Sequence, residues 1–159
     1  MRVGILTISD SGARGGREDT SGQAIRDMVG LAGGEVIAYQ IVPDEADQIA
    51  TVLIDWADSG LVDLILTTGG TGLGPRDVTP EATRPLLSRE LPGIAEAMRA
   101  EGLKHTPRAM LSRAVAGARG TTLIVNLPGS PKGVRESLGA VVDVLAHALE
   151  ILQARPTDH

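Results

Sequence analysis

Residues 62–81 of the chain read VDLILTTGGTGLGPRDVTPE, which contains a complete strand-to-helix unit. The apolar run 62–67 is typical of a buried strand, and the glycine-rich stretch 68–79 is typical of a loop. Residues 79–81 indicate a helix start, with Thr79 as N-cap and a proline at the first helical position. Strands that feed helices in this way are the repeating unit of α/β folds.

The same unit recurs on both sides of this stretch. Further strands are expected at 3–8, 35–42 and 121–126, and helices at 20–32, from 44–45 to about 60, from 79, from 92 and at 131–152. The alternation predicts a single three-layer α/β/α domain with a mostly parallel sheet and helices on both faces. We expect this domain over residues 1–152 and a frayed tail at 153–159, while residues 104–120 show no clear pattern.

The composition restricts the core and the range of ligands. The chain has 159 residues and is 42% apolar, without phenylalanine, and its only aromatic residues are Tyr39 and Trp56. The core is therefore expected to be aliphatic, and platforms for stacking nucleic-acid bases are not expected. Trp56 falls on the apolar stripe of its helix, which favours packing in the core over contact with a ligand.

Charge and cysteine content exclude further classes of function. The net charge of −5 and the scattered basic residues argue against binding to long nucleic acids. The absence of cysteine excludes disulfides, a thiolate nucleophile and cysteine-ligated metal centres. The short apolar start at residues 3–8 is too brief for a signal peptide or membrane span, so we expect a cytoplasmic protein without a membrane partner.

Ligands of open α/β sheets bind beyond the carboxyl ends of the strands, so the loops at 9–12, 43–44, 68–79 and 127–133 are the candidate site. The third loop has four glycines within residues 69–74, which allows its backbone N–H groups to approach an anion. It matches neither the Walker A motif nor the dinucleotide-binding fingerprint. It is interpreted as a phosphate cradle, and a strand-to-helix turn without a ligand is the alternative.

Two aspartates follow strands on either side of this cradle. Asp44 and Asp77 are expected to face one another and to hold Mg²⁺ through carboxylate oxygens and water. Asp44 could instead cap the helix that follows it, with Asp47 at its third position. Asp77 could instead pair with Arg76 or brace the turn before Thr79.

The fourth loop places prolines around Gly129 and Ser130, followed by Lys132 at the start of the last helix. A helix N-terminus attracts anions, so this loop is a second candidate for substrate binding. The alternative is a rigid turn with a solvated lysine. The three histidines lie too far apart in the sequence to suggest a metal site, and none is assigned a catalytic role.

The motifs TTGGTG at 67–72 and PRDVTPEAT at 75–83 resemble the signature of the molybdopterin-binding MogA/MoaB family. Further matches cover nearly the whole chain: LTISD at 6–10, EDTSG at 18–22, IVPDE at 41–45, MLSR at 110–113 and NLPGS at 126–130. The chain is also similar to the G domain of gephyrin and to its plant counterpart. Some relatives have Asn or Gln where this chain has Ser130, which concerns only fine contacts to the substrate.

The resemblance implies a Mg²⁺-dependent transfer of AMP from ATP to molybdopterin, with Asp44 and Asp77 as the essential residues that position Mg·ATP. It also implies a homotrimer, or a hexamer built from trimers, that works with other proteins of molybdenum cofactor biosynthesis. Together with the loop analysis, it gives a set of expected substrate-binding residues: Ser9, Asp10, Ser11, Thr68, Gly69, Gly70, Thr71, Gly72, Pro75, Arg76, Ser112, Pro128, Gly129, Ser130 and Lys132.

Two other functions compete with this hypothesis. The chain could be a non-catalytic molybdopterin-binding or trimeric scaffold protein of the MoaB type, and retention of both aspartates argues for the enzyme instead. A nicotinamide-dependent oxidoreductase would fit the fold class, but the first strand lacks the glycine fingerprint that such enzymes use.

Overall fold

The computed structural model describes residues 1–154 of the chain. Its elements in chain order are β1 (Arg2–Ile8), α1 (Asp10–Ala13), α2 (Thr20–Leu31), β2 (Glu35–Val42), α3 (Ala46–Asp58), β3 (Leu64–Thr68), α4 (Thr79–Thr83), η1 (Arg84–Leu86), β4 (Arg89–Glu90), α5 (Pro92–Leu103), η2 (Pro107–Leu111), β5 (Ala116–Arg119), β6 (Thr122–Leu127) and α6 (Pro131–Leu152).

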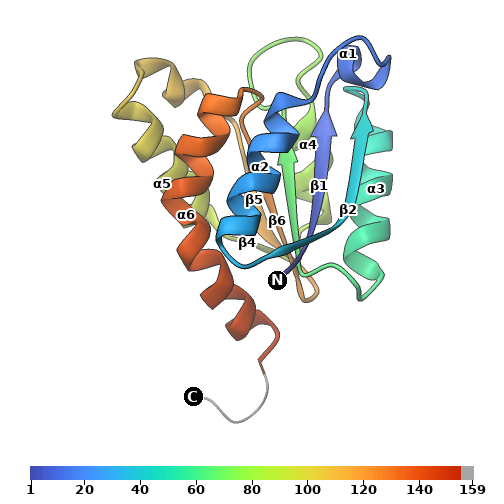
Figure 1. Ribbon diagram of the computed structural model, residues 1–159, viewed down its shortest axis with the longest axis vertical. Helices are drawn as coiled ribbons and strands as arrows, with labels where there is room; N and C mark the ends of the chain where they lie inside the picture. Colours follow the sequence, from blue (N-terminus) through green and yellow to red (C-terminus); the bar gives the residue numbers. More distant parts are fainter. Residues whose placement is uncertain (155–159) are drawn as a thin grey trace.

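The centre of the fold is a six-stranded sheet in the order β2-β1-β3-β6-β5-β4. The first four strands in this order are parallel, and Figure 1 shows their arrows pointing the same way. These are the four strands expected from the sequence, displaced by at most two residues at either end. The predicted α/β class and mostly parallel sheet are confirmed.

The far edge of the sheet was not predicted. Strands β5 and β4 are antiparallel to their neighbours and form the edge beyond β6. Strand β5 has the sequence Ala-Gly-Ala-Arg, which lacks the β-branched residues that indicate a strand. Gly117 is needed there because a Cβ atom at this position would overlap the carbonyl oxygen of Arg89 on β4.

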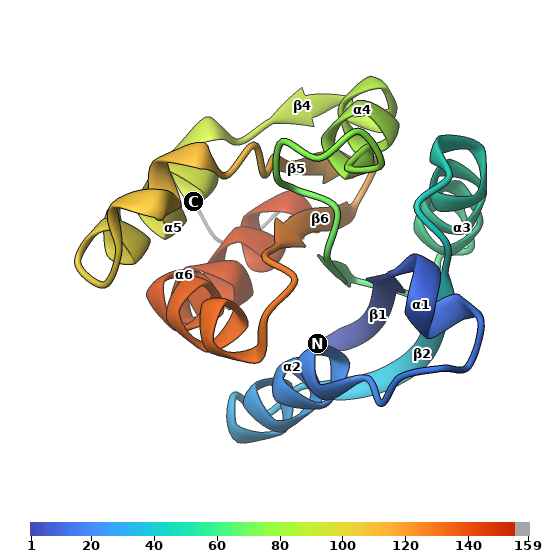
Figure 2. The ribbon, with the colours of Figure 1, turned by 90° about the horizontal axis from the view of Figure 1, so that it is seen from above.

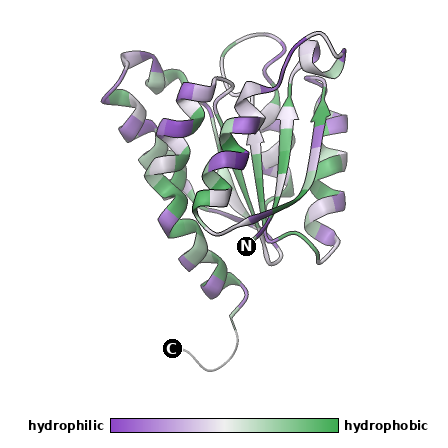
Figure 3. Cartoon of the chain, in the orientation of Figure 1, coloured by the Kyte–Doolittle hydropathy of each residue, from purple (hydrophilic) through white to green (hydrophobic). Residues whose placement is uncertain are grey.

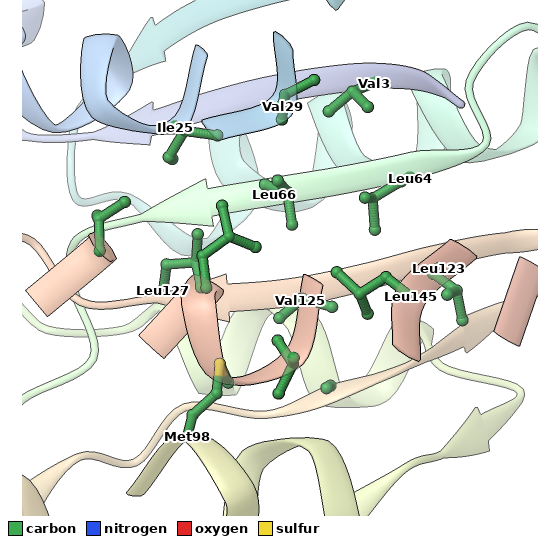
Figure 4. Packing of buried hydrophobic residues seen from close by; sticks show 14 of the residues in the cluster. Val3, Ile25, Val29, Leu64, Leu66, Met98, Leu123, Val125, Leu127 and Leu145 are labelled. Carbon is green, nitrogen blue, oxygen red and sulfur yellow. The ribbon is translucent and has the colours of Figure 1, made fainter. Parts of the chain in front are cut away.

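Helices cover both faces of the sheet, which gives the three predicted layers. Figure 2 shows α2, α5 and α6 on one face and α3 and α4 on the other. The larger core joins Val3, Leu66 and Val125 of the sheet to Ile25 of α2 and Leu145 of α6 (Figure 4). Apolar residues line the strands, and polar residues are concentrated on the outer faces of the helices (Figure 3).

The smaller core contains the one tryptophan of the chain. Trp56 of α3 packs over Gly4 of β1, where a Cβ atom would lie 2.7 Å from the indole Cε3. The expected packing role of Trp56 is therefore confirmed. Its fit against the sheet depends on the missing side chain at position 4.

The last helix ends at Leu152, as expected. Gln153 then donates hydrogen bonds to Asp63 Oδ1 at 2.9 Å and to the carbonyl oxygen of Thr121 at 3.2 Å, so this first residue of the predicted tail is anchored. The rest of that tail, 155–159, lies outside the described residues. Within residues 1–154, no helix is long and apolar enough to cross a membrane.

Candidate functional site

The carboxyl ends of the parallel strands meet at the upper edge of the sheet in Figure 1. Thr7 of β1 pairs with Thr68 of β3, and Thr68 pairs with Leu127 of β6, so the following loops start side by side. The hydroxyl of Thr68 also donates to the carbonyl of Pro128 at 2.6 Å, which ties the third and fourth loops together. Strand β2 lies on one side of β1 and strand β3 on the other, so the sheet has a topological switch point between β1 and β3. Ligands of open α/β sheets bind at such a point.

The glycine-rich loop has a fixed backbone that only glycine can adopt. Gly69 and Gly70 have φ angles of 101° and 70°, and Cβ atoms on them would overlap the Ile8 carbonyl and the Thr79 hydroxyl. Thr79 donates its hydroxyl to the Gly69 carbonyl at 2.9 Å and its N–H to the Gly70 carbonyl at 3.1 Å. The prediction of Thr79 as a helix N-cap was wrong by one residue: Val78 holds that position, because the Thr79 hydroxyl binds the loop.

Asp44 and Asp10 join the ends of β2 and β1 through two reciprocal hydrogen bonds. The N–H of Asp10 donates to Asp44 Oδ2 at 3.0 Å, and the N–H of Asp44 donates to Asp10 Oδ1 at 3.0 Å. The guanidinium of Arg76 binds the Asp10 carboxylate at 3.0 and 3.1 Å and also reaches Glu45 at 2.8 Å. These Arg76 hydrogen bonds, and then the Asp44 N–H, hold the pKa of Asp10 below its usual value.

Asp44 does not cap α3, because Glu45 is the N-cap residue and no side chain closes that end. Burial raises the pKa of Asp44, and the charges of Asp10 and Asp77 raise it further, against the opposing hydrogen bond from Asp10. Asp77 Oδ2 accepts the N–H of Gly74 at 2.9 Å, so it braces its own turn and does not pair with Arg76.

The two carboxylates flank the glycine-rich loop. A Cβ atom built on Gly70 would lie 3.2 Å from Asp44 Oδ1, and one on Gly72 would lie 3.0 Å from Asp77 Oδ2. The electrostatic effect of Asp77 on Asp44 is consistent with this arrangement. The expected placement of both aspartates beside the cradle therefore agrees with the geometry, and their catalytic role stays a prediction.

These residues fit a Mg²⁺ ion that is shared with phosphate groups. Across residues 1–154, no group of three or more His, Cys, Asp or Glu side chains is arranged to hold a metal ion. Asp44 and Asp77 could supply two oxygen ligands, and Oδ1 of each has no hydrogen-bond partner in the described part of the chain. Magnesium is commonly held by one or two carboxylates together with water and substrate phosphates, which matches this donor set.

The first loop forms the short helix α1. Ser9 is its N-cap and accepts the N–H of Gly12 at 3.0 Å, and its hydroxyl oxygen lies 3.2 Å from that of Ser11. Both hydroxyls therefore contribute to the local structure of the turn. Their expected contact with substrate stays a prediction.

The fourth loop lies directly against the cradle. A Cβ atom on Gly129 would be 3.4 Å from the Cα atom of Gly69, which is van der Waals contact distance, so the two loops lie side by side. Ser130 caps α6 by accepting the N–H of Gly133 at 3.0 Å. Lys132 is 79% exposed, so its side chain is solvated, as the alternative interpretation of this loop expected.

Arg113 holds the other side of the glycine-rich loop and was not among the predicted site residues. Its Nε donates to the Gly72 carbonyl and one terminal nitrogen donates to the Asp77 carbonyl, both at 2.8 Å. Its N–H also donates to the Thr71 carbonyl at 2.9 Å, and the guanidinium pairs with Glu81 at 2.6 Å. The MLSR motif contained this residue, but its contacts to carbonyl groups depend on the folded path of the loop.

Two cavities open beside the glycine-rich loop. The smaller, of about 100 Å³, is lined by Ser9, Thr68, Gly69 and Gly129, and the larger, of about 300 Å³, is lined by Thr71, Gly72, Ser112, Pro128 and Ser130. The other predicted site residues line neither of these two cavities: Asp10, Ser11, Asp44, Gly70, Pro75, Arg76, Asp77 and Lys132. The carboxylates of Asp44 and Asp77 and the two cavities therefore border different parts of the glycine-rich loop.

A mostly parallel α/β sheet with a glycine loop between two carboxylates is an arrangement that suits an anion-binding protein of the phosphoryl- or nucleotidyl-transfer type. The family model described as "Probable molybdopterin binding domain" matches residues 4–147, and the chain belongs to this family. The resemblance found in the motifs is thereby confirmed.

Known relatives support this assignment. The chain is 43% identical over 154 residues to a molybdopterin adenylyltransferase of Helicobacter pylori strain J99, covering 96% of this chain and 88% of the relative. It is 44% identical to gephyrin of Dictyostelium discoideum over 97% of this chain and 23% of that longer protein. The crystal structure of the molybdopterin biosynthesis enzyme MoaB from Thermus thermophilus has a TM-score of 0.91 at 61% identity, covering 99% of both chains.

Proposed function

We propose that this chain transfers AMP from ATP to the terminal phosphate of molybdopterin, forming adenylylated molybdopterin and pyrophosphate in the biosynthesis of molybdenum cofactor. The observation that carries the proposal is the pair Asp44 and Asp77 on either side of a glycine loop that also borders a cavity of about 300 Å³. One side of the loop suits a metal-bound triphosphate, and the cavity suits the pterin. Relatives named molybdopterin adenylyltransferase support the same reaction.

The reaction needs alignment and charge neutralisation more than proton removal. The attacking phosphate is a monoester whose second pKa is about 6, so it is already largely a dianion near neutral pH. This is consistent with a site in which no histidine or cysteine lies among the loops at the sheet edge. Backbone N–H groups of the glycine loop and the N-terminus of α6 would offset the negative charge of the phosphates.

Asp44 and Asp77 are the residues that would hold Mg²⁺, and the ion would neutralise charge on the triphosphate. Asp10 positions Asp44 through the reciprocal hydrogen bonds, and Arg76 fixes Asp10. Arg113 positions Asp77 by binding its carbonyl oxygen. The chain therefore orients both carboxylates from opposite sides of the loop.

The direct test uses purified protein with molybdopterin and Mg·ATP, and measures the AMP-linked product. Asp77→Asn should keep the fold, because an amide oxygen can still accept the N–H of Gly74, and should lose most adenylylation. Wild-type activity in this variant would refute the metal role. Binding of molybdopterin without turnover by the wild type would favour the non-catalytic module.

The same proposal includes a homotrimer, or a hexamer of two trimers, that acts in the cytoplasm, where ATP is available. Large apolar side chains are exposed on the single chain, including Leu73, Met110 and Leu111, and subunit contacts would cover such residues. Light scattering of the purified protein measures the oligomer directly. A monomeric mass would contradict this part of the proposal.

A further inference from the structure

The larger cavity contains a residue that no sequence motif marked. This cavity lies between α5, η2 and the first turns of α6, and it borders the glycine loop at Thr71 and Gly72. Helix α6 contributes Glu136 and Ser137 to its lining, one turn beyond the loop that the sequence singled out. A ligand that fills this cavity therefore contacts both the cradle and the side of α6.

Glu136 has a carboxylate oxygen that lacks a hydrogen bond. Its side chain is only 16% exposed, and Oε1 is buried without a hydrogen-bond partner among the described residues. The nearest nitrogen atoms of basic side chains are His105 Nδ1 at 3.8 Å and Lys132 Nζ at 3.9 Å, both beyond hydrogen-bonding distance. Leaving such an oxygen unsatisfied is costly, so a donor is expected to come from a ligand.

Two further polar side chains of the cavity, Asn126 and Arg99, are already hydrogen-bonded within the protein. The amide of Asn126 donates to the hydroxyls of Thr67 and Thr83, and its oxygen accepts the N–H of Val115. Arg99 donates to backbone carbonyls. Glu136 thus lines the cavity with a carboxylate oxygen, Oε1, that can still accept a hydrogen bond. The cavity is otherwise mostly apolar.

A pterin offers the donors that this oxygen lacks. The 2-amino-4-oxo ring carries two adjacent N–H donors, at N3 and on the 2-amino group, and a carboxylate accepts such a pair in parallel. We propose that Glu136 is the specificity-determining residue for the pterin ring, accepting hydrogen bonds from this edge while the glycine loop contacts the phosphate. The inference rests on the proposed function, since it takes molybdopterin as the substrate.

The test compares two fluorescent ring probes that differ at one position. The first, 6-hydroxymethylpterin, has the 2-amino group, and 6-hydroxymethyllumazine has an oxygen in its place. Equilibrium dialysis with the full chain measures both dissociation constants without any turnover. Wild-type protein should bind the pterin at least about tenfold more tightly, the effect of one charge-assisted hydrogen bond.

Glu136→Gln should weaken pterin binding about 10- to 100-fold and remove the preference, because an amide donates to the lumazine oxygen as readily as it accepts an N–H. Glu136→Asp keeps the charge on a shorter side chain and should keep the preference at lower affinity. Glu150→Gln is the matched control on the same helix, because that side chain is 80% exposed and lies outside the cavity lining. Thermal unfolding checks that each variant is folded.

The outcomes separate this inference from the proposed function. The inference is overturned if Glu136→Gln retains the wild-type preference, if the wild type binds both rings equally, or if it binds neither at millimolar concentration. If the wild type shows no adenylylation but still prefers the pterin probe, and this preference depends on Glu136, the proposed enzymatic function is rejected and the pterin site is retained. In an active enzyme, Glu136→Gln should raise KM for molybdopterin and leave KM for ATP unchanged.

Discussion

Removal of the Arg113 side chain should loosen the turn that carries Asp77. Arg113→Ala removes two hydrogen bonds to the carbonyls of Gly72 and Asp77 and an ion pair with Glu81, and keeps the backbone bond to Thr71. Each hydrogen bond contributes about 1 kcal/mol, and the exposed ion pair adds little, so the loss of stability should be about 2 kcal/mol. For a chain of this size, that corresponds to a fall of about 4–8 °C in Tm.

The loss of activity should exceed what the loss of stability explains. A displacement of about 1 Å at a positioned carboxylate can reduce the rate about 100-fold, so kcat should fall about 10- to 100-fold at a temperature where the variant is fully folded. Arg119→Ala is the control: its guanidinium binds one backbone carbonyl, of Leu86, where Arg113 binds two, and it likewise binds one carboxylate, of Asp58, far from the site. Equal kcat values in the two variants at similar Tm would refute a positioning role for Arg113.

Two other substitutions test the charge and the backbone of the site. Asp44→Asn should abolish adenylylation and yet raise the free energy of unfolding at pH 7, because the raised pKa of Asp44 means that its ionised form destabilises the folded state. That gain should shrink as the pH falls through the raised pKa, and a gain that is independent of pH in denaturant titrations would contradict it. Gly69→Ala should cost about 3 kcal/mol or more, because it combines a positive φ angle with overlap of the Ile8 carbonyl. Gly60→Ala, with a φ angle of 74° and no atom within 4 Å of the added Cβ, should cost only about 1 kcal/mol, and equal losses would show that the overlap is relieved.

The parts of the fold that carry periodic apolar patterns could be predicted from the sequence. Four strands and the long helices bury aliphatic residues at regular spacing, and their predicted bounds agree with the structure to within about two residues. Strand β5 could not be predicted, because its residues Ala116–Arg119 lack strand propensity and Gly117 is required only by the space beside β4. Tertiary packing, and not local preference, therefore defines that edge of the sheet.

The candidate site shows the same division between local pattern and long-range contact. Asp44 and Asp77 were found because each follows a strand, and the topology of a parallel sheet brings such residues to one edge. Arg113 and Glu136 follow no such rule. The Arg113 guanidinium acts by binding carbonyl groups that lie up to 41 residues away in the sequence, and Glu136 is distinctive only because folding buries Oε1 without a donor. Contacts to backbone carbonyls and buried oxygens without a hydrogen bond leave no pattern in a sequence. Residues that position or select a substrate in these ways are therefore recognised only from the folded loop and cavity. The two aspartates would specify the chemistry, and the contacts made by Arg113 and Glu136 would specify where the reacting groups are held.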